Sequence, residues 1–194
     1  IHLAQRVGEP AEPLIGKLSQ SRSIAEIVDV VRQKVEKTEP GKLVWLLRGP
    51  RPNQIAEKRW PNRNDFDPVS PDNPVIVTFA GDYVNVANSL ALKAAGIDRN
   101  VDQPYKRGGF GEFELDPRTG EPTGVVIGKG AHRILREGEN FNVWPSDMLE
   151  TNIARALDEA IAPAGITNLS DPLTATNNQP THHAYQRLSR REEG

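Results

Sequence analysis

The chain has 194 residues, and its 24 Lys and Arg against 26 Asp and Glu give a net charge of −2 at pH 7. No block rich in Lys or Arg precedes the C-terminus, so the electrostatic footprint of a nucleic-acid partner is not seen. The lack of cysteine excludes disulfides, thiolate metal sites and a cysteine nucleophile. No apolar run reaches membrane-spanning length, and we expect no membrane partner and a cytoplasmic location.

The N-terminal part of the chain predicts a helix followed by buried strands. Ser23 and Glu26 have the spacing of a capping box, and the apolar residues that follow recur with helical period, which predicts a helix over 23–37. The apolar run 43–47 lies between two glycines and has the length of a strand buried on both faces of a parallel sheet. The run 74–79 predicts another strand. A helix that leads into such strands is typical of an α/β fold.

The middle of the chain predicts less regular structure. Residues 49–73 are rich in proline and poor in apolar residues, so we expect a long irregular segment of the kind that often carries function. Residues 86–95 predict a short helix that ends at Gly96. The segments 110–115 and 125–127 flank turn-forming residues and predict a β-hairpin.

The C-terminal part returns to the α/β pattern, with a helix predicted over 147–162 and a short strand over 166–169. We therefore predict an α/β fold, a partial (β/α) TIM-type barrel formed by 1–48 and 146–194, interrupted by an α+β insert over 49–145. Because a complete barrel of this type needs about 250 residues, we expect the chain to be the central part of a longer protein. Open strand edges would then favour a homo-oligomer or association with the missing parts of the barrel.

Four segments follow one another along the chain in a characteristic order and spacing. They are 57–75 (EKRWPNRNDFDPVSPDNPV), 87–97 (ANSLALKAAGI), 116–125 (DPRTGEPTGV) and 164–169 (AGITNL). Together they resemble the amidohydrolase 3 family in its YtcJ-like branch. The resemblance implies a metal-centred α/β barrel that hydrolyses non-peptide C–N bonds in small amide, formamide or cyclic amide substrates. It also implies one or two divalent metal ions, expected to be zinc.

The resemblance places one metal ligand, His2, in this chain. Ile1-His2-Leu3 resembles the tail of the His-x-His motif that opens the metal site of the family. Two histidines one residue apart on a strand point the same way and can bind one Zn²⁺. The remaining ligands would lie outside the chain, and a single terminal histidine is more often simply solvated. For His132, His182 and His183, and for Asp171 before a proline, surface or turn roles are at least as well supported by the sequence.

Two positions near the expected substrate site depart from the family pattern. Many relatives carry a Gly-His pair five residues before the Asn-Ser, and the nearest position here is Tyr83, whose hydroxyl can donate a hydrogen bond to a carbonyl. Many relatives also carry a glutamate where this chain has Gly128, which favours one metal or an altered activity. Asn88 is a second candidate substrate contact, although its position also suits a helix cap.

Two other functional classes stay open at this point. The chain could be a catalytically incompetent, truncated relative that acts as an interaction or structural module, which the two departures and the missing ligands favour. It could also be a plain α/β binding domain without any relation to hydrolases.

Overall fold

The computed structural model describes residues 13–80, 83–107 and 110–129, together with positions 131, 135, 154 and 163. The chain divides into two compact units, one of which is Glu12–Phe141. The other consists of Ile1–Ala11 and Asn142–Gly194 and contains only positions 154 and 163 of the described residues. The fold given below is therefore that of the unit Glu12–Phe141.

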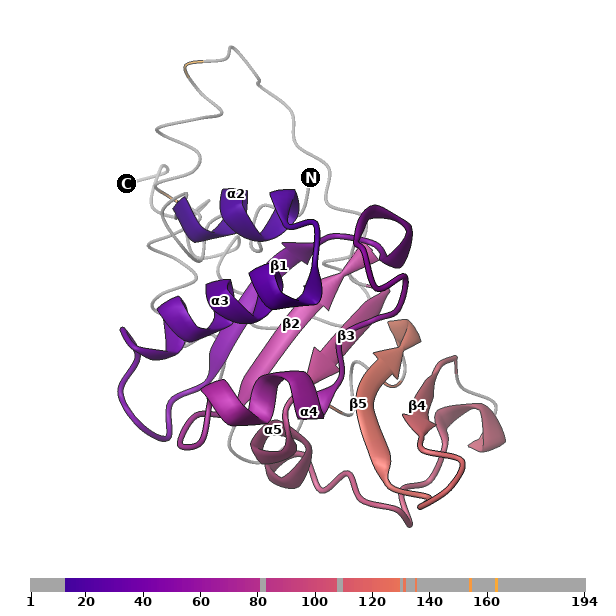
Figure 1. The fold of residues 1–194 in the computed structure, drawn as a ribbon. Coiled ribbons are helices and arrows are strands. Elements are labelled where there is room, and N and C mark those ends of the chain that lie inside the picture. The colour runs from indigo at the N-terminus through magenta and orange to yellow at the C-terminus, as the bar shows by residue number, and fades with distance from the viewer. Residues whose placement is uncertain are drawn as a thin grey trace, which may run out of the picture. The chain divides into compact units, whose positions relative to one another are not determined.

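The described strands form one five-stranded mixed sheet in the order β1-β2-β3-β5-β4 (Figure 1). β1 (Val44–Gly49) pairs in parallel with β2 (Val75–Phe79). The other pairs are antiparallel: β2 with β3 (Val84–Ala87), β3 with β5 (Pro122–Ile127), and β5 with β4 (Glu112–Leu115). The hairpin predicted from the turn residues is thus confirmed as β4 and β5.

Within the described residues, two helices precede the sheet, α2 (Pro13–Gln20) and α3 (Ile24–Val35). Figure 1 shows α3 lying across β1. α3 confirms the helix predicted from the capping box, since Ser23 Oγ accepts a 3.2 Å hydrogen bond from the backbone N–H of Glu26. Its apolar stripe packs on the face of the sheet made by alternate residues of β1, β2, β3 and β5. The buried core of this face includes Ile27, Val31, Leu46, Val77, Phe79 and Val86.

The expectation that β1 is buried on both faces was wrong. Val44 and Leu46 are each 1% exposed, whereas Trp45 and Leu47 are only half-buried. β1 lies at one end of the described sheet, where α2 and α3 cover the face of Val44 and Leu46. β2 has neighbours on both sides and is buried throughout, so its prediction from 74–79 is confirmed.

The helix expected over 86–95 begins later than predicted. Its first two residues belong to β3, because Val86 and Ala87 pair with β2. The helix itself is α5 (Ser89–Ala94), and Gly96 follows it with a φ of +68°, as expected for a residue just past a helix end.

The proline-rich segment 49–73 is less irregular than expected. It contains three short helices, η1 (Pro52–Gln54), α4 (Arg63–Phe66) and η2 (Asp67–Val69). A fourth short helix, η4 (Pro104–Arg107), precedes β4. These short pieces place polar side chains against the end of the sheet and against α5.

The barrel remains a prediction, because the described strands form one five-stranded sheet with both parallel and antiparallel pairs. The domain boundaries at 48 and 145 also remain predictions. The C-terminal helix and strand expected over 147–162 and 166–169 lie outside the described residues, apart from position 154, which is helical.

Candidate functional site

Asn88 lies at the centre of a buried hydrogen-bond network between β2 and α5. Its Oδ1 accepts from the backbone N–H of Val75 and of Ala91, both at 2.9 Å. Its Nδ2 donates to Ser70 Oγ at 2.9 Å and to the carbonyl of Asn73 at 2.8 Å. Asn88 is 0% exposed, and both its amide oxygen and its amide nitrogen are bonded to the protein. This geometry supports a capping and docking role, and the substrate contact suggested for Asn88 stays a prediction.

The next residue ties α5 to the segment before β2. The backbone N–H of Ser89 donates to Asp67 Oδ1 at 2.8 Å, and Ser89 Oγ donates to Asp67 Oδ2 at 2.7 Å. Gly124 of β5 joins the same cluster from the other side. A Cβ on Gly124 would collide with the carbonyl oxygen of Ala87 and would lie 3.0 Å from the backbone nitrogen of Arg63. Glycine is therefore required for the close approach of β5 to α4.

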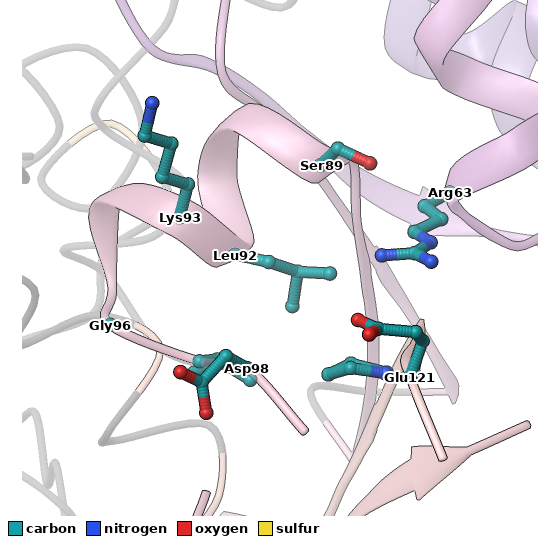
Figure 2. A pocket seen from close by; sticks show the side chains of 9 residues that line it. Arg63, Ser89, Leu92, Lys93, Gly96, Asp98 and Glu121 are labelled. Carbon is teal, nitrogen blue, oxygen red and sulfur yellow. The ribbon is translucent and has the colours of Figure 1, made fainter. Parts of the chain in front are cut away.

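Arg63 and Ser89 also line a pocket of about 280 Å³, shown in Figure 2. We call it the Arg63–Glu121 pocket. Its walls come from three of the four segments that carry the family resemblance. The lining includes Arg63, Ser89, Leu92, Ile97, Asp98 and Glu121. No sequence pattern predicts this pocket, because its residues come from separate short elements.

The start of α4 is held by the ion pair of Arg59 with Asp65. Arg59 donates to Asp65 through both terminal nitrogens, at 2.7 and 2.9 Å, and the backbone N–H of Asn62 donates to the same carboxylate at 2.8 Å. Burial acts to raise the pKa of Asp65, but the hydrogen bonds from Arg59 and Asn62 outweigh it and lower this pKa below its usual value. The carboxylate is therefore held in its charged form.

The two departures from the family pattern lie together at the opposite end of β3. The backbone N–H of Gly128 donates a 2.8 Å hydrogen bond to the carbonyl oxygen of Tyr83. The side chain of Tyr83 is 59% exposed. Gly128 has a φ of +79°, and a Cβ there would lie 2.8 Å from the Cα of Gly111. Phe110, next to Gly111, is 86% exposed. This end of the sheet thus presents aromatic side chains around a tight glycine contact.

A series of side-chain hydrogen bonds crosses the face of the sheet opposite to that of Val44 and Leu46. Trp45 Nε1 donates to Thr78 Oγ1 at 2.8 Å, and Thr78 Oγ1 donates to Asn85 Oδ1 at 2.7 Å. Asn85 is 0% exposed, and no residue in the described part of the chain accepts a hydrogen bond from its Nδ2. The sequence analysis did not predict these hydrogen bonds, although Thr78 and Asn85 stand out as polar residues in otherwise apolar strands.

Comparison with known proteins gives this structure its family. The model of the amidohydrolase family matches residues 16–193, which is most of the chain. This chain belongs to the amidohydrolase family. The resemblance seen in the four segments is thereby confirmed. The amidohydrolase chain is 31% identical over 110 residues to N-substituted formamide deformylase from Arthrobacter pascens, which is 57% of this chain and 19% of that protein. It is 33% identical over 93 residues to YtcJ of Bacillus subtilis, a protein named as an amidohydrolase, over 47% of this chain and 17% of YtcJ.

Solved structures show the same fold. An uncharacterised metal-dependent hydrolase from Pyrococcus horikoshii superimposes with a TM-score of 0.59 at 18% identity, over 99% of this chain and 33% of that one. A second such protein, from Pyrococcus furiosus, gives a TM-score of 0.53 at 18% identity, over 99% of this chain and 34% of that one. The amidohydrolase chain therefore spans about a third of the length of these structures and less than a fifth of the length of the two relatives above.

The described part of this amidohydrolase does not by itself contain a metal centre. In residues 13–80, 83–107 and 110–129, no group of three or more His, Cys, Asp or Glu side chains is placed to hold a metal ion. His2, the ligand expected from the sequence, lies outside the described residues, as do His132, His182, His183 and Asp171. Among the helices that the structure describes, none is long and apolar enough to cross a membrane.

Proposed function

We propose that this chain is the central part of a metal-dependent hydrolase that cleaves non-peptide C–N bonds in small amide-type substrates. The observation that carries the proposal is the amidohydrolase family match over residues 16–193. The 31% identity to N-substituted formamide deformylase supports an amide or formamide bond as the target. The same comparisons favour an enzyme over the alternative of a non-catalytic interaction module.

In this proposal a divalent metal, zinc first among the candidates, is held by His2 and by ligands outside the described residues. Such an ion would polarise the substrate carbonyl and lower the pKa of a bound water. The proposal further assigns the exposed hydroxyl of Tyr83 as a hydrogen-bond donor to the substrate carbonyl. Gly128 carries no side chain that could serve as an additional ligand, which favours a single metal ion.

The surroundings of the protein belong to the same proposal. We expect small-molecule substrates, no nucleic-acid or membrane partner, and a cytoplasmic location. A homo-oligomer, or pairing of β1 with other parts of a barrel, would cover the outer edge of β1, which has no neighbouring strand in the described sheet.

The test uses the full-length gene product purified without added chelator. Its metal content is measured by elemental mass spectrometry, and release of formate or carboxylate is followed for N-substituted formamides, linear amides and cyclic amides. Dipeptides and simple esters serve as comparison substrates. We expect a stoichiometric divalent metal and hydrolysis of a non-peptide amide that stops after chelation and returns with zinc. Hydrolysis that survives complete metal removal, or a metal-loaded protein inactive on the whole amide panel, would contradict the proposal.

A further inference from the structure

Two residues at the carboxyl ends of the parallel strands β1 and β2 have left-handed backbone conformations. Arg48 has a φ of +70° and Ala80 has a φ of +49°, although neither is a glycine. The two positions are close, because Gly49 pairs with Phe79 across the two strands. Left-handed conformations are strained for residues with a Cβ, and such strain is concentrated at functional sites. This end of the sheet is therefore a candidate for a further site.

The unusual conformation of Arg48 is imposed by the packing of the next residue. The register of β1 on β2 shifts between Leu46 and Gly49, so Arg48 lies in a bulge. A Cβ on Gly49 would collide with the ring of Phe79. That ring is fully buried, and its centroid lies 5.5 Å from the ring centroid of Trp60. The bulge is thus held against a fixed aromatic ring, and a bulge of this kind redirects the side chain that it carries.

The side chain of Arg48 makes no contact that explains an arginine at this position. It is exposed, and no hydrogen bond or ion pair joins it to another described residue. A glycine would adopt the same φ without strain. Arginine therefore adds strain to the bulge, and nothing within the described part of the chain offsets it. A ligand of the guanidinium would supply the missing interaction.

Arg48 and Tyr83 lie at the same end of the sheet. β1 and β2 run toward this end and β3 begins there, since Phe79 pairs with Val84 (Figure 1). β1 and β3 flank β2, and strands separated in this way lie about 10 Å apart. In open α/β sheets, ligands bind outside the carboxyl ends of the parallel strands. Because both side chains are exposed, one small molecule at this end can reach both of them.

The chemistry of the guanidinium selects the group that it would bind. A planar guanidinium matches a carboxylate with two parallel N–H···O hydrogen bonds. One guanidinium balances the single negative charge of a carboxylate. A phosphate group carries close to two negative charges at neutral pH and would be left partly unbalanced. A carboxylate is therefore the better partner for Arg48.

We propose that Arg48 is a specificity-determining residue that binds a carboxylate of the substrate, while Tyr83 faces the substrate carbonyl at the same end of the sheet. The preferred substrate is then an amide that carries a carboxylate a few bonds away from its C–N bond. This inference rests on the function proposed above, but binding is measured separately from hydrolysis, so the two proposals can fail independently.

The test measures the dissociation constants of two matched formamides for the full-length gene product by ligand-observed saturation-transfer NMR. N-formyl-β-alanine and N-propylformamide share the formamide group and the chain length, but only the first carries a carboxylate. The variants are Arg48→Met, which removes the charge, and Arg48→Gly, which also removes the backbone strain. Arg51→Met is the matched control, because Arg51 is exposed on the same segment and has an ordinary φ of −83°. Thermal unfolding shows whether each variant is folded.

We expect N-formyl-β-alanine to bind the unmodified protein and Arg51→Met about three- to tenfold more tightly than N-propylformamide. This preference should disappear in both Arg48 variants. Arg48→Gly should also unfold at a temperature no lower than that of the unmodified protein, because glycine relieves the strain of the bulge. A lower unfolding temperature for Arg48→Gly would give Arg48 a structural role instead.

Three binding results would overturn the proposal. They are an unchanged preference in folded Arg48→Met, an equal loss of preference in Arg51→Met, and no preference for N-formyl-β-alanine in the unmodified protein. Hydrolysis of the same two formamides separates this inference from the proposed reaction. A binding preference without hydrolysis contradicts the reaction alone, whereas hydrolysis without the preference contradicts the role of Arg48 alone.

Discussion

The backbone N–H of Gly128 lies 2.8 Å from the carbonyl oxygen of Tyr83 and donates a hydrogen bond to it. These are the two positions at which the sequence departs from the pattern of its family, and they lie 45 residues apart in the chain. The register of β3 on β5, which pairs Val84 with Ile127, brings them together. The two departures are therefore one local feature of the sheet end. In this arrangement a side chain at position 128 would collide with Gly111.

The glycine at 128 can be tested against a glycine in open space. Gly120 has a similar φ of +72°, but nothing lies within 4 Å of the place where its Cβ would be. Gly120→Ala should therefore cost only the left-handed backbone strain, about 1–2 kcal/mol. Gly128→Ala should cost roughly 1–3 kcal/mol more, because the backbone at Gly111 must move. Chemical denaturation measures both. Equal losses would show that the contact with Gly111 relaxes freely.

We expect Asn88 to contribute more to the stability of the fold than to substrate binding. Asn88→Ala removes the cap of α5 and leaves the buried N–H of Val75 without its acceptor, at a cost of roughly 2–4 kcal/mol. Asn88→Asp keeps the acceptors for Val75 and Ala91, but its second carboxylate oxygen would face the carbonyl of Asn73 as a buried charge, so it should be at least as damaging at neutral pH. Denaturation midpoints of the two variants decide the order. A raised KM in an Asn88→Ala protein of unchanged stability would instead favour the substrate contact.

The sequence predicts an element correctly where its signal lies within a few neighbouring residues. Ser23 and Glu26 are three residues apart, and the helix they predict begins where expected. The start of α5 was misplaced because Val86 and Ala87 suit a helix as well as a strand, and only pairing with β2 decides. The contact of Thr78 with Asn85, like that of Arg63 with Gly124, depends on strand register and on chain crossings. No spacing rule along the sequence contains that information.

Asp65 gives the fold a predicted sensitivity to acid. Its pKa is lowered in the folded protein, so its contribution is fully present above the ordinary value of 3.8 and is lost as pH falls below it. Stability should therefore drop between about pH 4 and pH 2 in the native protein, and less steeply in Asp65→Asn. Asp29 pairs with Arg32 at an exposed site, and Asp29→Asn is the matched control with little expected effect. Urea denaturation at several pH values measures the slopes. If Asp29→Asn flattened the slope as much as Asp65→Asn, the Arg59 contact would not be the cause.

Tyr83 offers the sharpest link between the sheet end and the proposed reaction. Its carbonyl, not its hydroxyl, holds Gly128, so Tyr83→Phe should leave the fold unchanged. If the hydroxyl donates to the substrate carbonyl, its loss should lower kcat/KM on the best amide about tenfold. Tyr105 is similarly exposed, at 55% against 59% for Tyr83, and Tyr105→Phe is the matched control.

The split between kinetic constants separates the two ways in which Tyr83 could act. A hydrogen bond made equally to substrate and transition state changes KM, whereas one that strengthens as charge develops on the carbonyl oxygen lowers kcat. The Tyr83 hydroxyl is exposed in the absence of substrate, so it loses hydration when substrate binds, and this loss offsets the hydrogen bond in the ground state. We therefore expect Tyr83→Phe to lower kcat more than it raises KM. Identical kinetics for Tyr83→Phe and Tyr105→Phe would remove Tyr83 from the substrate site.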